Sequence, residues 1–334
     1  MPRGAAIPHP ARPAAQPDAA LRFAAALLAA ALAAAAFGLA VNNPFILTLS
    51  AYTCAFSLFA LSLNVMLGWL DEVPLGQCLF FGIGAYGAGI VTVRLGLPYA
   101  AAVPLAMVAA LATAVPIGVL TLRLTGAYFS IVSWGLSGVA LVAALNLADL
   151  TGGPLGLFGF PSLAFGPLDL TDPRTYFLTT AGILLAALAV LGAIRHSRFG
   201  AAVESIRQNR HLARSVGVRV DRERLKAFVL SAPLAALGGA LCVPFTQIVT
   251  PEVFSVGNTV DALLMVLLGG PRLLAGPVLG AAIFTVAPYY LNLDPNVRTL
   301  VFSAAIILIM MFAPGGLHQI GLALWGRVRR LRRG

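Results

Sequence analysis

The segment RHSRFGAAVESIRQNRHLARSVGVRVDRERLK, Arg195–Lys226, holds nine of the 22 lysine and arginine residues and separates two long apolar regions. Gly200 and Gly217 bracket a run without glycine or proline, which predicts a short helix with a glycine after its end. A short helix held at the membrane surface between two spans is typical of a docking element. The alternative is a solvated basic loop that only fixes the topology by its charge.

The predicted helix is amphipathic. Phe199, Val203 and Ile206 form a short apolar stripe at helical spacing, while the charged residues lie largely on other faces. Asp221 is placed to cap a second helix, which continues into the apolar sequence from Leu225. The segment is therefore predicted to be folded against the membrane, with a half-apolar surface.

The composition decides the class of protein. The chain has 334 residues, of which 59% are hydrophobic and 10% are charged, and its mean hydropathy is +0.91. A soluble domain of this size cannot bury so much apolar surface. Long unbroken apolar runs exclude a β-barrel, whose strands alternate between apolar and polar residues. The predicted fold class is all-α, a polytopic transmembrane helical bundle of about ten spans with broken helices.

The apolar runs predict ten spans, each limited by charged, glycine or proline residues. Their approximate ranges are 21–41, 45–67, 75–93, 98–120, 127–147, 176–194, 227–249, 260–268, 274–291 and 297–312. Ten spans place both termini on the same side. With the termini in the cytoplasm, 19 of the 22 basic residues lie on the cytoplasmic side, as the positive-inside rule requires. This distribution accounts for the net charge of +10 without a nucleic-acid partner.

The same pattern gives five predicted regions. They are a disordered cytoplasmic N-terminal tail (1–20), a first transmembrane half (21–194), a cytoplasmic coupling loop and helix (195–226), a second transmembrane half (227–313) and a basic cytoplasmic C-terminal tail (314–334). A polar loop rich in glycine and proline, residues 149–174, interrupts the first half.

Two helix breaks resemble each other across the two halves. In LGWLDEVPLGQCLFFGIGAYGAGI, Leu67–Ile90, a helix is expected to end at Gly68 and to restart after Pro74 and Gly76. In LLGGPRLLAGPVLGAAIF, residues 267–284, the expected break is Gly269, Gly270 and Pro271, with a restart near Gly276 and Pro277. Backbone groups freed by a break at membrane depth must face protein or water, so paired breaks indicate a translocation path. Ordinary cytoplasmic turns are the alternative.

Small and polar residues inside the spans suggest three further roles. The glycines at 82, 84, 87 and 89 stand at helical spacing and predict close helix packing. Asp261 lies inside a predicted span and is by default a functional candidate, although it also falls close to the predicted outer interface. Asn64 lies well inside the second predicted span, where its amide is expected to bond across helices.

Residues that would carry enzymatic chemistry are lacking. Lys226 is the single lysine, so a phosphate-binding G-x-x-x-x-G-K-[ST] loop is impossible. The four histidines, His9, His196, His211 and His318, lie outside the predicted spans and are dispersed, which predicts no metal site. The serines are not in a nucleophile elbow. The chain is therefore predicted to be a transport subunit and not an enzyme.

Four stretches of the chain resemble the permease subunits of branched-chain amino-acid ABC importers, the LivM-type membrane component. The resemblance covers residues 60–317. The four stretches are LSLNVMLGW with FFGIGAYGA (61–69 and 80–88), LRLTGAYFSIVS with LTGGPLGLFGFP (122–133 and 150–161), SRFGAAVESIRQN through LKAFVLSA (197–232), and LLMVLLGGPRLLAGPVLGA (263–281). Four such blocks in order are far more specific than any one of them.

The resemblance implies the ABC importer permease fold and an importer in the bacterial inner membrane. Such a machine has two permeases, two cytoplasmic ATPases and a periplasmic substrate-binding protein; this chain would pair with a homologous H-type permease. It would carry no cofactor, because the ATPase subunits use the ATP. The residues expected to couple to the ATPase are Glu204, Arg207, Asn209, Ala213 and Gly217. The residues expected along the substrate path are Asn64, Tyr128, Thr151, Gly152, Gly153, Asp261, Gly269 and Gly270.

Three places depart from the pattern of the resembled family and leave the solute open. The family commonly has S-L-G-H after the first break, where this chain has Asp71–Pro74 and Gln77. An acid common in the fifth span is replaced near Gly138, and the second break reads GGPRL. Urea or short-chain amide importers are therefore an alternative. An ion-coupled secondary transporter would need more carboxylates inside the spans, and a purely structural protein would not need paired breaks.

Overall fold

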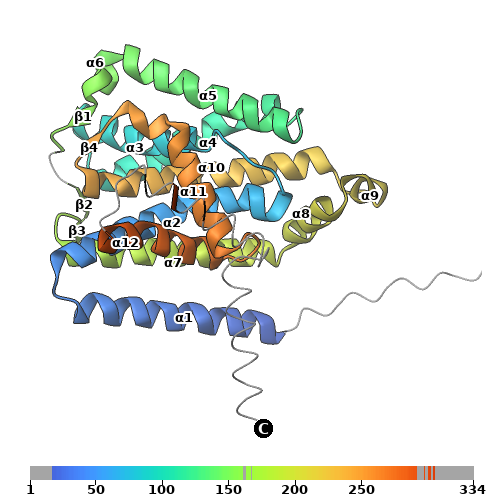
Figure 1. Ribbon diagram of the computed structural model, residues 1–334, viewed down its shortest axis with the longest axis horizontal. Helices are drawn as coiled ribbons and strands as arrows, with labels where there is room; N and C mark the ends of the chain where they lie inside the picture. The colour runs from blue at the N-terminus through green and yellow to red at the C-terminus, as the bar shows by residue number, and fades with distance from the viewer. Residues whose placement is uncertain are drawn as a thin grey trace, which may run out of the picture.

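A computed structural model describes residues 17–160, 163–166, 168–291, 297, 300, 301 and 304. The helices form one elongated bundle (Figure 1). They are α1 (Pro17–Ala40), α2 (Pro44–Leu70), α3 (Cys78–Val93), α4 (Tyr99–Thr121), α5 (Ala127–Asn146), α6 (Ala148–Thr151), α7 (Pro173–Arg195), α8 (Arg198–Gln208), α9 (Arg210–Ser215), α10 (Val220–Thr246), α11 (Val256–Gly269) and α12 (Gly276–Leu291).

Within the described residues, six helices are long and apolar enough to cross a membrane: α1, α2, α4, α5, α7 and α10. The helices α3, α11 and α12 are apolar but shorter. At 1.5 Å per residue, the 14 residues of α11 extend about 21 Å, which is less than the ~30 Å thickness of the hydrocarbon core. The predicted tenth span, 297–312, and both predicted tails lie largely or wholly outside the described residues. The structure therefore confirms a helical bundle with apolar helices but does not confirm ten spans.

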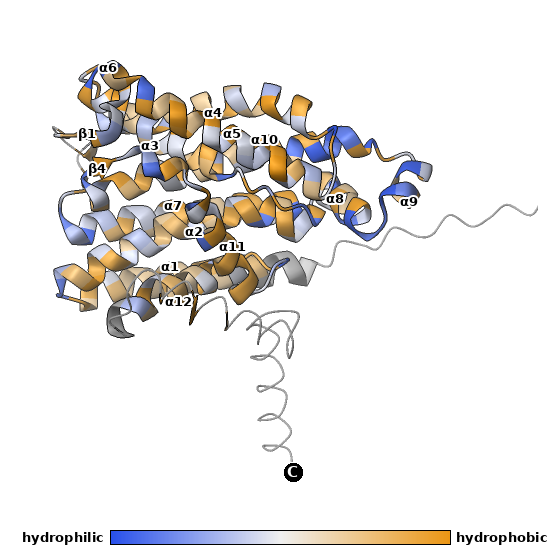
Figure 2. Ribbon diagram, turned by 45° about the horizontal axis from the view of Figure 1, so that its top comes forward, coloured by the Kyte–Doolittle hydropathy of each residue, from blue (hydrophilic) through white to orange (hydrophobic). Residues whose placement is uncertain are grey.

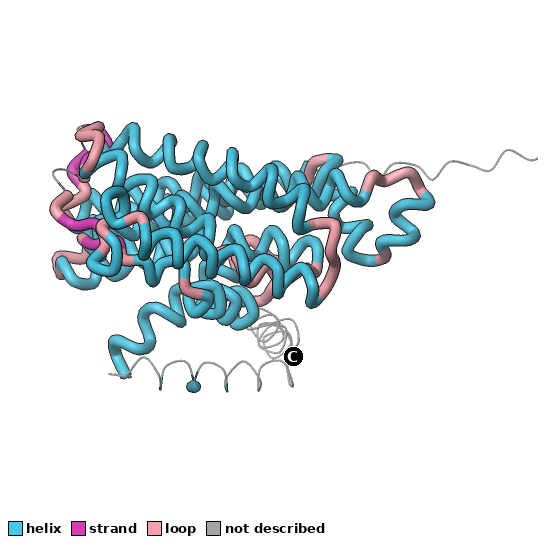
Figure 3. The backbone as a smooth tube through the Cα atoms, turned by 90° about the horizontal axis from the view of Figure 1, so that it is seen from above, coloured by secondary structure: helices cyan, strands magenta, loops and turns pink. Residues whose placement is uncertain are grey.

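The two ends of the bundle differ in structure. Helices α8 and α9 project from one end, and the start of α1 lies at the same end (Figure 1). The short strands gather at the opposite end (Figure 3). There β1 (Leu157–Phe158) pairs with β4 (Ile248–Val249), and β2 (Ala164–Phe165) pairs with β3 (Leu168–Asp169), both antiparallel. Two 3-10 turns adjoin these strands in the sequence: η1 (Gly153–Leu155) precedes β1, and η2 (Pro251–Phe254) follows β4. Hydrophobic residues dominate the long helices between the ends (Figure 2).

Helices α2 and α10 form the centre of the bundle, and α10 packs against α2, α3 and α4. Glycines allow these helices to approach closely. A Cβ on Gly84 of α3 would overlap the carbonyl group of Ala236 in α10, and one on Gly239 would overlap the carbonyl group of Phe81. Gly87 packs on Ala106 of α4 in the same manner. The prediction that the glycine series serves helix packing is therefore confirmed at these positions.

The basic segment differs from its prediction in two respects. It forms two short helices, α8 and α9, where one was expected, because Asn209 between them has an extended backbone with φ −161° and ψ 112°. Helix α10 begins at Val220 with Arg219 as its N-cap, so residues 220–226 belong to that helix. Asp221 lies in the first turn of α10 and does not cap it.

The second helix break is confirmed, and the first lies slightly later than expected. Helix α2 continues through Gly68 to Leu70 and ends because Asp71 adopts a left-handed conformation, with φ 59°. Helix α3 then begins at Cys78, which leaves residues 71–77 irregular; we call them the first break. Helix α11 ends at Gly269 and α12 begins at Gly276, and we call residues 270–275 the second break.

Candidate functional site

Helices α8 and α9, which we call the surface segment, are folded onto the end of the bundle by an apolar stripe. The Ser197 hydroxyl accepts a hydrogen bond from the amide of Phe199 at 3.2 Å and caps α8. Val203 and Ile206 are buried, and α8 packs against α2, α7 and α10. The predicted amphipathic helix is therefore present, with its apolar face against the transmembrane helices.

Helix α8 also carries an ion pair between Glu204, whose side chain is 37% exposed, and Arg207, whose side chain is 15% exposed. The two residues are three positions apart on the helix, and the Arg207 guanidinium donates to both carboxylate oxygens. Chiefly through this hydrogen bond, Arg207 lowers the pKa of the Glu204 carboxyl below its ordinary value, although partial burial acts in the opposite direction. The hydrogen-bonded pair thus stabilises the ionised form of the Glu204 carboxyl.

Asn209 and Ala213 stabilise the surface segment. The Asn209 side-chain oxygen accepts hydrogen bonds from the amides of His211 at 2.9 Å and Leu212 at 3.0 Å, so it caps α9. Ala213 is buried, whereas Leu212 and Val216 are exposed at the tip. The sequence does not predict that these two apolar side chains are exposed. Helical spacing alone does not show which side chains of a short helix remain exposed to solvent.

Gly217 ends α9 with φ 89°, and its amide donates to the carbonyl of Arg214 at 3.0 Å. The neighbouring amide of Val218 reaches the carbonyl of Ala213, also at 3.0 Å. Nothing lies within 4 Å of the position where a Cβ would stand on Gly217. Glycine is required here by the backbone conformation and not by lack of space.

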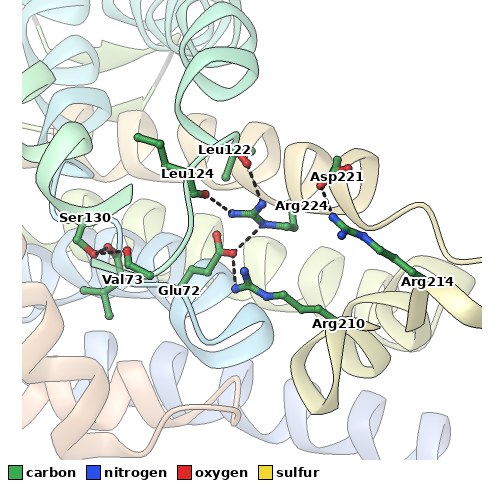
Figure 4. Close-up of polar contacts among 10 residues, drawn as sticks. Glu72, Val73, Leu122, Leu124, Ser130, Arg210, Arg214, Asp221 and Arg224 are labelled. Atoms are coloured by element: carbon green, nitrogen blue, oxygen red, sulfur yellow. Dashed lines mark hydrogen bonds and ion pairs between the residues drawn. The ribbon is translucent and has the colours of Figure 1, made fainter. Parts of the chain in front are cut away.

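A buried ion cluster links the surface segment to the first break (Figure 4). The carboxylate oxygen Oε1 of Glu72 accepts from Nε of Arg224 at 2.7 Å and from Nη2 of Arg210 at 2.6 Å. Arg224 also donates through Nη1 to the carbonyl of Leu122 at 2.8 Å and through Nη2 to that of Leu124 at 2.9 Å. The cluster therefore joins the first break, the end of α4, the start of α9 and the first turns of α10.

Helix α5 holds the rest of the first break in place. The Ser130 hydroxyl donates to the carbonyl of Val73 at 2.6 Å, and the Ser137 hydroxyl donates to that of Gly76 at 3.1 Å. The Ser133 hydroxyl accepts from the amide of Gly76 at 3.3 Å. The backbone groups freed by the break at Val73 and Gly76 thus have partners on α5.

The start of α3 connects the first break with the start of α11. The amide of Cys78 donates to the Thr259 hydroxyl at 3.0 Å, and the Cys78 thiol donates to the carbonyl of Phe254 at 3.2 Å. The Phe254 ring stacks on Tyr86 of α3, with ring centroids 5.6 Å apart. Hydrogen bonds therefore join the residue directly after the first break to η2 and α11.

A cavity of about 720 Å³ lies beside these elements, among α2, α3, α5, α10, η2 and α11. Its volume is in the range of small-molecule sites. The apolar residues of its lining include Tyr52, Phe56, Phe81, Leu141, Val243 and Val260. The polar residues of its lining include Thr246, Thr250, Glu252, Ser255, Asn258 and Asp261. A lining that contains both apolar side chains and carboxylates suits a small solute that has an apolar part and a cationic group.

The structure does not bring the predicted path residues together. Asp261 lines the cavity. Asn64 instead holds the second break, because its Nδ2 donates to the carbonyl of Leu273 at 3.1 Å and its Oδ1 accepts from the amide of Arg272 at 3.4 Å. Tyr128 is 73% exposed on α5, away from the lining of the cavity. The bond across helices that the sequence predicts for Asn64 is not found among the described residues; its partners are backbone groups of the second break.

The remaining predicted path residues stabilise turns of the backbone. The Thr151 hydroxyl donates to the carbonyls of Ala144 and Leu147, at 2.6 and 2.8 Å, and Gly152 and Gly153 have positive φ angles in the turn that follows. Other glycines close the second break: a Cβ on Gly269 would overlap the carbonyl of Gly276, and Gly270 has φ 105°. None of these residues is among those that line the cavity.

Comparison with known proteins identifies the class to which this architecture belongs. The family model "Branched-chain amino acid transport system / permease component" matches residues 45–313, and the chain belongs to this family. The match includes both helix breaks, the surface segment and the cavity. The prediction of a transport subunit rather than an enzyme is confirmed by this membership.

Individual relatives agree with the family. The high-affinity branched-chain amino acid transport system permease protein LivM of Escherichia coli K12 is 28% identical over 307 residues, covering 84% of this chain and 72% of the relative. The probable branched-chain amino acid transport permease protein LivH of Methanocaldococcus jannaschii is 26% identical, covering 59% and 63%. The autoinducer 2 import system permease protein LsrC of Klebsiella pneumoniae is 32% identical, covering 46% of each chain. No solved structure gives a significant match.

Proposed function

We propose that this chain is the permease subunit of an ATP-driven importer for branched-chain or related amino acids. It forms the translocation path together with a homologous H-type permease, and two cytoplasmic ATPase subunits drive the pair. A periplasmic binding protein delivers the solute. Support comes from the family match over residues 45–313 and from relatives of both the LivM and the LivH kind.

The observation that carries the choice of solute is the mixed lining of the cavity. Its aromatic and aliphatic side chains suit an aliphatic side chain of the solute, and the carboxylates of Glu252 and Asp261 suit its ammonium group. Urea has neither an aliphatic chain nor a cationic group at neutral pH. The cavity therefore favours an amino acid over urea and short-chain amides.

The orientation follows from the basic residues. The surface segment is placed in the cytoplasm, together with both termini, because the arginine-rich connections gather on one side of the spans. The exposed tip of α9, with Leu212 and Val216, then faces the ATPase subunits.

The test is transport by the complete complex in liposomes, with the cognate binding protein on one side and ATP on the other. We expect ATP-dependent uptake of leucine, isoleucine or valine, and no uptake when the ATPase subunits carry an inactivated nucleotide site. Uptake of urea with exclusion of these amino acids would instead support the amide importer. Uptake by the single chain under an ion gradient, without nucleotide, would rule out the ATP-driven machine.

A further inference from the structure

Glu72 is a buried carboxylate in a place where the resembled family commonly has a different sequence. Its side chain is 1% exposed, and its Oε2 atom has no hydrogen-bond partner among the described residues. A buried carboxylate is tolerated only with close positive charge. Two arginines supply that charge, and both reach the same oxygen, Oε1, from different elements.

Arg224 is the fixed partner of Glu72. Its side chain is 3% exposed, and all three guanidinium nitrogens have a partner: Glu72, the carbonyl of Leu122 and the carbonyl of Leu124. Because the guanidinium is planar, it cannot turn away from one of these acceptors without weakening its bonds to the other two. Arg224 therefore ties Glu72 to the end of α4 and compensates its charge whatever the surface segment does.

Arg210 is the releasable partner. It reaches Glu72 through one nitrogen, its side chain is 30% exposed, and it stands at the first position of α9, a helix of six residues. When Arg210 leaves, Glu72 keeps the charge of Arg224, so no unpaired carboxylate is left behind. The contact thus joins a movable surface element to a fixed buried one.

We propose that the contact between Arg210 and Glu72 is the link through which the surface segment moves the first break. Arg210 acts as a positioning residue, because it pulls on Glu72 and never meets the solute. The displacement then passes from the first break to Cys78, whose amide and thiol hold Thr259 and Phe254 beside the cavity. The inference rests on the proposed function, since it assumes that the ATPases push on α8 and α9.

A control contact lies on the same short helix. Arg214 of α9 also pairs with a carboxylate of α10, Asp221, at 3.2 Å, but both side chains are more than half exposed. A surface pair of this kind contributes little. Arg210 and Arg214 therefore carry the same charge on the same element, and only Arg210 reaches the first break (Figure 4).

The experiment measures solute molecules imported per ATP hydrolysed by the complete complex in liposomes. Physical coupling between two sites is worth ~5- to 150-fold, so we expect Arg210→Gln to lower this ratio about tenfold. Arg210→Lys should keep the ratio near that of the wild type, because one donor nitrogen is enough. Arg214→Gln should leave it unchanged. In chains that already carry Glu72→Gln, Arg210→Gln should have no further effect.

Three outcomes overturn the inference: an unchanged ratio in Arg210→Gln, an equal fall in Arg214→Gln, or failure of the Arg210→Gln chain to assemble, which would make the contact purely structural. Assembly is checked by size-exclusion chromatography and by the melting temperature of each complex. If the wild-type complex hydrolyses ATP and imports no amino acid, the proposed function itself fails. The two failures are therefore distinguishable.

Discussion

At the scale of single residues, chemical type and burial together decide what each charged side chain does. Glu204 and Glu72 are both paired with arginine. Glu204 pairs within one helix at the surface, whereas Glu72 joins segments that are 138 and 152 residues away in sequence. The first pair is a local device for keeping charge on α8. The second pair connects elements, so its loss should alter the relative positions of those elements and not only the charge.

Gly217 allows a direct test of backbone conformation in the surface segment. We expect Gly217→Ala to destabilise the protein by about 1 kcal/mol, because an L-residue is strained at φ 89°. The measurement is the midpoint of unfolding in detergent. Gly182→Ala in α7 is the matched control, since it also has open space around its Cβ but no positive φ. If Gly182→Ala lowered the midpoint of unfolding as much as Gly217→Ala, strain at the positive φ would not be the cause.

At the scale of elements, helix ends determine how the connections run. Asp172 caps α7: its carboxylate accepts from the amide of Thr175 at 2.9 Å and from the Thr175 hydroxyl at 2.7 Å. These hydrogen bonds lower the pKa of Asp172 below its ordinary value. Asn209 caps α9 in a similar way, and its extended backbone separates α8 from α9. Both caps are visible in the sequence only as polar residues before a helix.

Replacing Asp172 with alanine should cost about 1 kcal/mol at pH 7, the usual contribution of an N-cap. The lowered pKa means that the folded state favours the ionised carboxylate. This contribution is therefore complete above the ordinary pKa of about 3.9 and is lost as the pH falls through the lower folded value. Unfolding midpoints of wild type and Asp172→Ala should converge in acid. A constant difference down to the lowest pH would show that charge is not involved.

At the scale of the whole molecule, the cavity and the surface segment are connected by the first break. The cavity is lined by residues from five helices and η2, and the surface segment packs on α2, α7 and α10. Glu72 of the first break contacts Arg210 of the surface segment, and Cys78, directly after the break, bonds to Thr259 and Phe254, which are sequence neighbours of residues that line the cavity. This arrangement allows a rigid-body displacement at one end to change the shape of the cavity.

Asp261 tests the role of the cavity. Loss of a charge-assisted hydrogen bond costs roughly 1.5–3 kcal/mol, so we expect Asp261→Asn to lower amino-acid uptake at least about tenfold. Asp149→Asn is the control, because Asp149 lies on α6 and is absent from the cavity lining. Uptake is measured in liposomes at fixed ATPase content. Normal uptake by Asp261→Asn would remove this carboxylate from the solute path.

The sequence by itself determined the membrane class, the approximate positions of the apolar helices, the second break at Gly269 and the buried stripe of Val203 and Ile206. These features are local, because they depend on composition, helical periodicity and the conformational freedom of glycine. Tertiary structure alone decided that Asp261 faces a cavity and that Glu72 meets Arg210 and Arg224. The sequence does not distinguish among the nine basic residues of the segment Arg195–Lys226. Only the packing of α9, α10 and the end of α4 around Glu72 assigns a buried ion pair to Arg210 and Arg224.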